Sequence, residues 1–147
     1  MDRFDADWAL EIIGREKIEF FFAVPTHMQR FLEAPAFTAQ EFSSVKSMYH
    51  AGAYCPVTLK QRWIDALGAD RVWELYGATD GAGASIISGE EWLGRPGTVG
   101  RAFESDIVIL DESGAQLPSN QIGEIYMRSH GALGDEPGFR YLGAKTP

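Results

Sequence analysis

The residues best able to do chemistry gather in the stretch WELYGATDGAG, residues 73–83. Tyr76 offers an aromatic face for stacking, Thr79 a hydroxyl for a phosphate oxygen, and Asp80 a carboxylate for Mg²⁺. Glycines between them let the chain turn tightly. A nucleotide needs all three contacts at once. The ordinary alternative is that Tyr76 packs in a core while Thr79 and Asp80 only shape a turn.

A second stretch of small residues, HAGAYCP at residues 50–56, also follows an expected strand. Its glycine and alanines would let a flat ligand approach the backbone closely. In an open α/β sheet, ligands lie beyond the carboxyl ends of the strands. We therefore expect the two stretches to lie at the same edge of one sheet.

Helical and extended patterns alternate over the first part of the chain. The expected helices are 5–17, 26–33 and 56–67, with a short helical turn at 37–42, and the expected strands are 18–24, 45–53 and 71–77. Proline at the start of the third helix and Gly68 after it are typical helix boundaries. This alternation predicts a parallel sheet with right-handed crossovers.

The pattern changes after Gly89, where turn formers become frequent and no further helix is expected. Residues 105–111 and 122–129 are expected to form antiparallel strands. The predicted fold class is therefore α/β: a partial parallel sheet with flanking helices, followed by a small antiparallel β subdomain. We place the boundary near Gly97, with an α/β subdomain at 1–97 and an incomplete β subdomain at 98–147.

Composition and charge limit the function classes. The 147 residues are 45% hydrophobic, enough for a real core, and carry a net charge of -8, which argues against a nucleic-acid partner held through phosphates. Three histidines and one cysteine leave little room for structural zinc. No apolar run is long enough for a membrane span, and the acidic N-terminus does not look like a signal peptide, so we expect a cytoplasmic protein.

Four ordered segments together resemble the adenylate-forming superfamily, which includes acyl-CoA synthetases, luciferases and the adenylation domains of peptide synthetases. The segments are AGAYCPVTL, YGATD, GRPGTVGRAF and GEIYMRS. The resemblance extends from about residue 18 to 129 and is greatest to the acyl-CoA ligase branch. It implies a central fragment of the large N-terminal domain, whose β part belongs to a distorted barrel.

The resemblance also implies roles for matching residues. The small-residue loop along the adenine and the Tyr-Gly-x-Thr-Glu segment together give the expected nucleotide-binding residues, namely Ala51, Gly52, Ala53, Tyr76, Gly77, Ala78 and Thr79. Tyr76 would stack on adenine. Thr79 would contact the α-phosphate and Asp80 would ligate Mg²⁺, so these two are the expected catalytic residues.

An aromatic strand and the turn after it are implied to border the acyl pocket. Its expected substrate-binding residues are Phe22, Pro25, Thr26 and His27, with Phe21 beside them. The ordinary alternative for His27 is a half-buried residue at a helix start. Two departures from the family pattern stand out: Asp80 replaces the usual Glu, and Tyr54 and Cys55 replace the common Pro and Leu.

The implied function is that of an ATP-dependent carboxylic acid–CoA ligase, which forms an acyl-adenylate and then an acyl-CoA thioester. ATP, Mg²⁺ and CoA would serve the whole enzyme, with a small carboxylic acid as substrate. The family's phosphate loop, its Thr-Gly-Asp segment and its lid lysine do not occur in this sequence. We therefore expect the chain alone to be inactive, and we expect self-association through strand edges left unpaired.

Two alternatives remain open. The first is a free-standing domain that binds nucleotide or protein without turnover. The second is a fragment of another adenylating enzyme, such as a peptide-synthetase adenylation domain or a luciferase-like enzyme.

Overall fold

The computed structural model describes residues 4–77 and 79–130. They form two compact units, one containing the residues up to Tyr76 together with Ile86–Gly100, the other containing Gly77–Ser85 and the residues from Arg101 onward. The subdomain boundary near Gly97 stays a prediction. None of the helices in the described ranges is long and apolar enough to cross a membrane.

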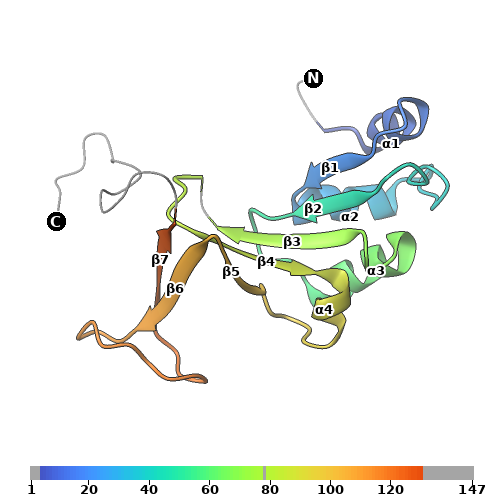
Figure 1. Cartoon of the computed structure of the whole chain (residues 1–147). Helices are drawn as coiled ribbons and strands as arrows, with labels where there is room; N and C mark the ends of the chain where they lie inside the picture. Colours follow the sequence, from blue (N-terminus) through green and yellow to red (C-terminus); the bar gives the residue numbers. More distant parts are fainter. Residues whose placement is uncertain (1–3, 78, 131–147) are drawn as a thin grey trace. The chain divides into compact units, whose positions relative to one another are not determined.

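Five strands form one sheet in the order β1-β2-β3-β4-β5 (Figure 1). They are β1 (Phe20–Ala23), β2 (Ser47–His50), β3 (Val72–Gly77), β4 (Ala84–Ser88) and β5 (Arg101–Phe103). β1 pairs with β2, and β2 with β3, in parallel. The α/β class and its parallel pairing are thereby confirmed.

Three helices follow the expected pattern, namely α1 (Ala6–Arg15), α2 (Pro25–Glu33) and α3 (Val57–Leu67). The Asp5 carboxylate accepts a hydrogen bond from the Trp8 amide at 3.0 Å and so caps α1. The prediction of no helix after Gly89 was wrong, because α4 spans Gly89–Leu93, with the Ser88 hydroxyl accepting from the Glu91 amide.

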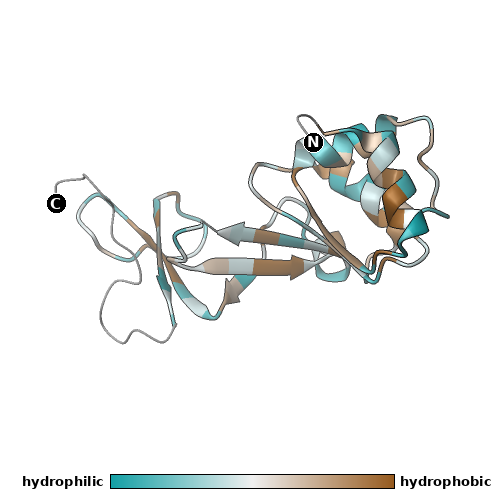
Figure 2. Cartoon of the chain, turned by 90° about the horizontal axis from the view of Figure 1, so that it is seen from above, coloured by the Kyte–Doolittle hydropathy of each residue, from teal (hydrophilic) through white to brown (hydrophobic). Residues whose placement is uncertain are grey.

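Hydrophobic residues are frequent along the helices and strands of the first unit (Figure 2). Within this core, five rings form an aromatic cluster, namely those of Phe21, Phe31, Phe37, Phe42 and Trp63. Trp63 of α3 is fully buried, and its ring lies 5.4 Å from Phe42 and 5.9 Å from Phe31. The Trp63 indole nitrogen donates a hydrogen bond to the Met28 carbonyl at 3.2 Å. The polar atom of this large side chain is therefore satisfied inside the core.

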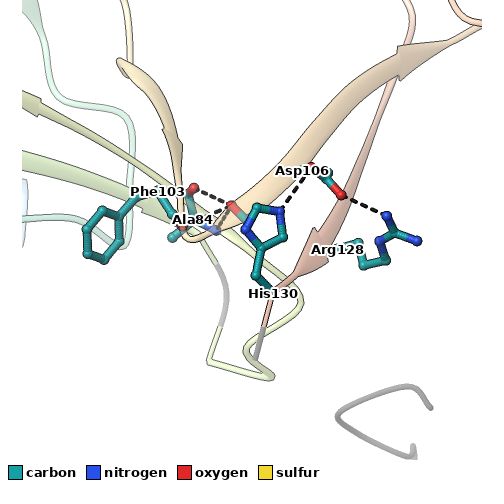
Figure 3. A network of polar contacts seen from close by, with 6 residues as sticks. Ala84, Phe103, Asp106, Arg128 and His130 are labelled. Carbon is teal, nitrogen blue, oxygen red and sulfur yellow. Dashed lines mark hydrogen bonds and ion pairs between the residues drawn. The ribbon is translucent and has the colours of Figure 1, made fainter. Parts of the chain in front are cut away.

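The second unit is built on two antiparallel strands, β6 (Ser105–Leu110) and β7 (Glu124–Ser129), as the sequence predicts. The Asp106 carboxylate lies between the Arg128 guanidinium at 2.8 Å and the His130 ring at 3.0 Å (Figure 3). Hydrogen bonds from both partners lower the pKa of Asp106. All three side chains are solvent-exposed, so these contacts orient the strand ends and add little stability.

Ser105 joins β6 to the first residue of β4 within the second unit. Its hydroxyl oxygen accepts from the Ala84 amide at 3.2 Å and lies 2.8 Å from the Ala84 carbonyl, to which it can donate (Figure 3). Ser105 is only 5% exposed. Because buried backbone groups must be paired, the Ser105 hydroxyl stabilises the end of the segment Gly77–Ser85 by bonding to both backbone groups of Ala84.

Strands β1 to β3 expose aromatic side chains on the face away from the aromatic cluster. Phe20, Tyr49 and Trp73 form an aromatic row, with ring centroids 5.4 Å apart for the first pair and 5.9 Å for the second. Phe20 is 56% exposed. A contiguous apolar patch of this kind on a sheet with an open edge favours association.

We expect the isolated chain to self-associate through the aromatic row, despite its net charge of -8. Light scattering over a concentration series should give an apparent mass that rises above 16.3 kDa. Phe20→Lys should return it toward the monomer, because it places a charge on the row. Trp8→Lys changes a similarly exposed aromatic residue on α1 and should have no such effect. A wild-type monomer at every concentration would contradict this expectation.

Candidate functional site

Three parallel strands end at one edge of the sheet in the first unit. Ala23 is in register with His50, and His50 with Glu74. The Ala51 amide donates to the Ala23 carbonyl at 3.4 Å, which continues the pairing one residue further. The structure therefore places the predicted adenine loop beside the predicted acyl-pocket segment, with the end of β3 next along the edge.

The loop at residues 51–53 presents backbone and small side chains. Gly52 has φ of 84°, and a Cβ there would lie 3.3 Å from Cγ1 of Val24. A larger residue would therefore be strained in conformation and crowded against the neighbouring segment. Gly52 and Ala53 are exposed and Ala51 is half-buried, so a flat ligand has access to this loop.

Tyr54 and Cys55, two of the three residues that depart from the family pattern, lie in different environments. Tyr54 is 79% exposed, whereas Cys55 is buried. Burial, together with the nearby Glu74 carboxylate, raises the pKa of the Cys55 thiol to about 11. The thiol is therefore protonated at neutral pH and is a poor nucleophile.

Tyr76 lies near the end of β3, two residues after Glu74. It is 40% exposed, so part of its ring is open to a ligand. Alternation along a strand places Tyr76 and Glu74 on the same face of the sheet. The interpretation of Tyr76 as a fully buried core residue is therefore wrong, and its stacking role stays a prediction.

The turn that carries Thr79 and Asp80 belongs to the second unit. A Cβ at Gly77 would lie 2.8 Å from the Gly83 carbonyl oxygen, so only glycine fits where the two ends of the turn approach each other. Oδ1 of Asp80 accepts a hydrogen bond from the Ala82 amide at 3.1 Å. Asp80 thus shapes its own turn. Ala78 lies outside the described residues.

Thr79 is exposed and Asp80 half-buried, so both can meet a ligand at this turn. Among residues 4–77 and 79–130, no three His, Cys, Asp or Glu side chains converge as a metal site. Mg²⁺ is often bound through one or two carboxylates, with water and substrate phosphates completing its shell. Asp80 could therefore hold the ion only together with a bound nucleotide, and both roles stay predictions.

The predicted acyl-pocket residues occupy different environments. Phe22 is 51% exposed and Thr26 is exposed, so both are available to a substrate. Pro25 is buried at the first position of α2. The His27 ring stacks on Phe4 with 4.3 Å between centroids, which gives it a packing role. Phe21 is a core residue, since its ring contacts Phe31, Phe42 and Trp63.

A buried polar cluster, missed by the sequence analysis, lies directly beneath this edge. It consists of His50, Lys60 and Glu74. The Lys60 ammonium donates to Oε2 of Glu74 at 2.7 Å and lies 4.9 Å from the centre of the Trp92 ring. Nε2 of His50 is 3.9 Å from the same carboxylate oxygen. Lys60 and His50 are both fully buried.

The charges in the buried polar cluster are set by its surroundings. Burial, together with the nearby Lys60 charge, lowers the pKa of His50 to about 3, so the ring is neutral at physiological pH. Burial also lowers the pKa of Lys60, although its hydrogen bond to Glu74 opposes this shift. One sequence signal could have revealed the cluster: Lys60 shares a helix face with Trp63, Ile64 and Leu67.

A model of the family described as AMP-binding enzyme matches residues 1–134. The mouse mitochondrial medium-chain acyl-CoA ligase ACSF2 is 30% identical over 132 residues, which is 86% of this chain and 21% of that ligase. Feruloyl-CoA synthase of an Amycolatopsis species is 28% identical over 124 residues, covering 83% of this chain and 25% of the synthase.

A solved structure extends the likeness to the fold. The amide bond synthetase McbA from Marinactinospora thermotolerans matches with a TM-score of 0.76 at 27% identity, covering 88% of this chain and 26% of that protein. The chain therefore spans about a fifth to a quarter of the length of these relatives. With the family model covering nearly all of it, the chain belongs to the AMP-binding enzymes, the adenylate-forming superfamily.

Proposed function

We propose that this chain is the central part of an ATP-dependent carboxylic acid–CoA ligase. The observation that carries the proposal is the sheet edge of the first unit, where residues 51–53 emerge beside the β1 segment and Tyr76 lies near the end of the next strand. A loop of small residues and an accessible aromatic ring suit a purine base. Two relatives, an acyl-CoA ligase and a feruloyl-CoA synthase, support a CoA thioester as the product.

The proposed reaction has two halves. A carboxylate oxygen of the acid attacks the α-phosphorus of ATP, and the bond to the leaving pyrophosphate breaks. The sulfur of the CoA thiolate then attacks the acyl carbon, and AMP leaves with the electron pair of the broken bond. Both halves gain most from positioning and from stabilising charge at phosphorus.

The residues of this chain would divide that work. Residues 51–53 and Tyr76 would hold the base, while the Thr79 hydroxyl would donate a hydrogen bond to an α-phosphate oxygen. Asp80 would bind Mg²⁺, which supplies positive charge against the phosphates when bound. Its hydrogen bond to the Ala82 amide holds the carboxylate close to the backbone before any ligand arrives. Such preorganisation lowers the reorganisation needed during the reaction.

One observation favours a second candidate. The amide bond synthetase McbA resembles this chain at 27% identity, which makes an amine a reasonable acceptor in place of the CoA thiol. The longer protein should therefore be tested for acid-dependent ATP–pyrophosphate exchange and then offered CoA or an amine. Thioester formation supports the ligase, amide formation the second candidate, and absence of acid-dependent exchange contradicts both.

The isolated 147-residue chain should show no acyl-CoA synthetase turnover, because the phosphate loop and catalytic lysine implied by the resemblance do not occur in its sequence. The purified chain would be incubated with ATP, CoA and a panel of fatty and aromatic acids, and AMP and thioester would be quantified. Turnover above that of a heat-killed sample would refute the interpretation of the chain as an inactive fragment.

In the longer ligase, Asp80→Asn should lower the rate of ATP–pyrophosphate exchange by two orders of magnitude or more. Loss of one well-placed electrostatic group costs ~3 kcal/mol of transition-state stabilisation. Asn keeps the turn hydrogen bond, so the fold should persist.

Asp111 provides a matched control for this variant. Its Oδ1 also accepts hydrogen bonds within its own turn, from the amides of Ser113 and Ala115, at a site far along the sequence. Asp111→Asn should leave the exchange rate within about twofold of wild type. If the two variants behave alike, Asp80 is only a turn residue.

A further inference from the structure

The Lys60–Glu74 ion pair joins the two segments that would enclose a purine base. Glu74 lies in β3 two residues before Tyr76, on the same face of the strand. Lys60 lies in the first turn of α3, the helix that follows residues 51–55. Their 2.7 Å contact therefore ties the strand that carries Tyr76 to the helix into which the small-residue loop leads.

His50 also lies beside this carboxylate; it is the last residue of β2 and immediately precedes the loop. It is in register with Glu74, and its Nε2 lies 3.9 Å from the Glu74 carboxylate. Neither ring nitrogen of His50 has a hydrogen-bond partner among the described residues. The start of the loop, the end of β3 and the beginning of α3 thus converge on one carboxylate.

Stability alone is a weak reason for such a pair. Removing an ammonium and a carboxylate from water is expensive, and apolar residues of similar volume are often equally stable in the same place. Lys60 is fully buried, and the Glu74 side chain is only 12% exposed. The pair does, however, have a fixed direction and length, which packed methylene groups lack.

We propose that Lys60 is a positioning residue for nucleotide binding: by fixing the Glu74 carboxylate, it sets the placement of residues 51–55 relative to Tyr76. The proposal rests on the proposed function, since it assumes that a purine base lies between these segments. It adds Lys60 to the residues that determine affinity for ATP.

The expected kinetic effect follows from the place of the base in the reaction. The base does not change between the ground state and the transition state, so contacts to it stabilise both states equally, which is called uniform binding. Loss of uniform binding raises KM and leaves kcat unchanged. Lys60 variants should therefore differ from Asp80→Asn, which lowers the rate itself.

The decisive variant is the double replacement Lys60→Met, Glu74→Met. Lys60→Met alone leaves an unpaired buried carboxylate and should lower Tm by roughly 10 °C. The double variant leaves no unpaired charge, so its Tm should return to within a few degrees of wild type. If the pair positions the loop, the double variant should still raise KM for ATP by about tenfold, with kcat within about twofold.

The exposed pair Lys46–Glu19 is the matched control. It joins the same residue types in the first unit, but both side chains are more than half exposed. Lys46→Met, Glu19→Met should change neither Tm nor KM appreciably. A Lys60→Met, Glu74→Met enzyme with wild-type KM would overturn the proposal, because stability would then be the only role of the pair.

A spectroscopic measurement on the 147-residue chain separates this proposal from the proposed function. Amide chemical shifts of residues 51–55 and 74–77 should change in the Lys60–Glu74 double variant and stay constant in the control. If they change but the longer protein shows no acid-dependent exchange, the proposed function fails while the positioning role of Lys60 stands. Unchanged shifts in residues 51–55 would overturn the positioning role itself.

Discussion

Parallel hydrogen bonding among β1, β2 and β3 is the constraint on which the candidate site depends. Parallel strands run in the same direction, so the register row of Ala23, His50 and Glu74 brings three carboxyl ends to one level. Beyond this row the three segments differ, since β1 turns into α2, β2 leads into a loop of small residues, and β3 extends to Tyr76. Their closeness is a consequence of strand direction and does not require contacts among their side chains.

The last row before this edge differs from the row beneath it. Met48 and Val72, one step back on the same face, are fully buried and apolar. His50 and Glu74 occupy the equivalent positions one step nearer the edge, and Lys60 reaches them from α3. The buried polar side chains thus lie at the last row of paired residues, where the backbone of β2 leaves the sheet. A directional contact is most useful there, because strand pairing no longer holds the chain.

Much of the first unit could be predicted because its local signals agree with its tertiary structure. Alternating apolar strands and amphipathic helices predicted the parallel sheet, and the helix expected at 5–17 corresponds to α1. Helix α4 escaped prediction because five residues are too few for a helical period, and its buried Trp92 is placed by tertiary contacts. The buried polar cluster escaped for a related reason. Lys60 on the buried face of α3 was a visible signal, but its partner Glu74 lies in β3, and the packing of the helix on the sheet brings the two within 2.7 Å.

Chain geometry also explains the shorter acid at position 80. An aspartate can accept a hydrogen bond from the amide two residues onward, and Oδ1 of Asp80 does so with Ala82. A glutamate would reach further but would not hold this compact turn as tightly. A metal bound by Asp80 must therefore approach close to the backbone. Gly81, the next residue, has φ of 76°, and a Cβ there would meet nothing within 4 Å, so that side of the turn is open. A Cβ at Gly77 or Gly83 would instead meet the Gly83 carbonyl oxygen or Met127 at 2.8 Å, so these two glycines let the turn close. An aspartate at position 80 therefore reaches less far than a glutamate would, but its hydrogen bond to the Ala82 amide fixes the position of the carboxylate.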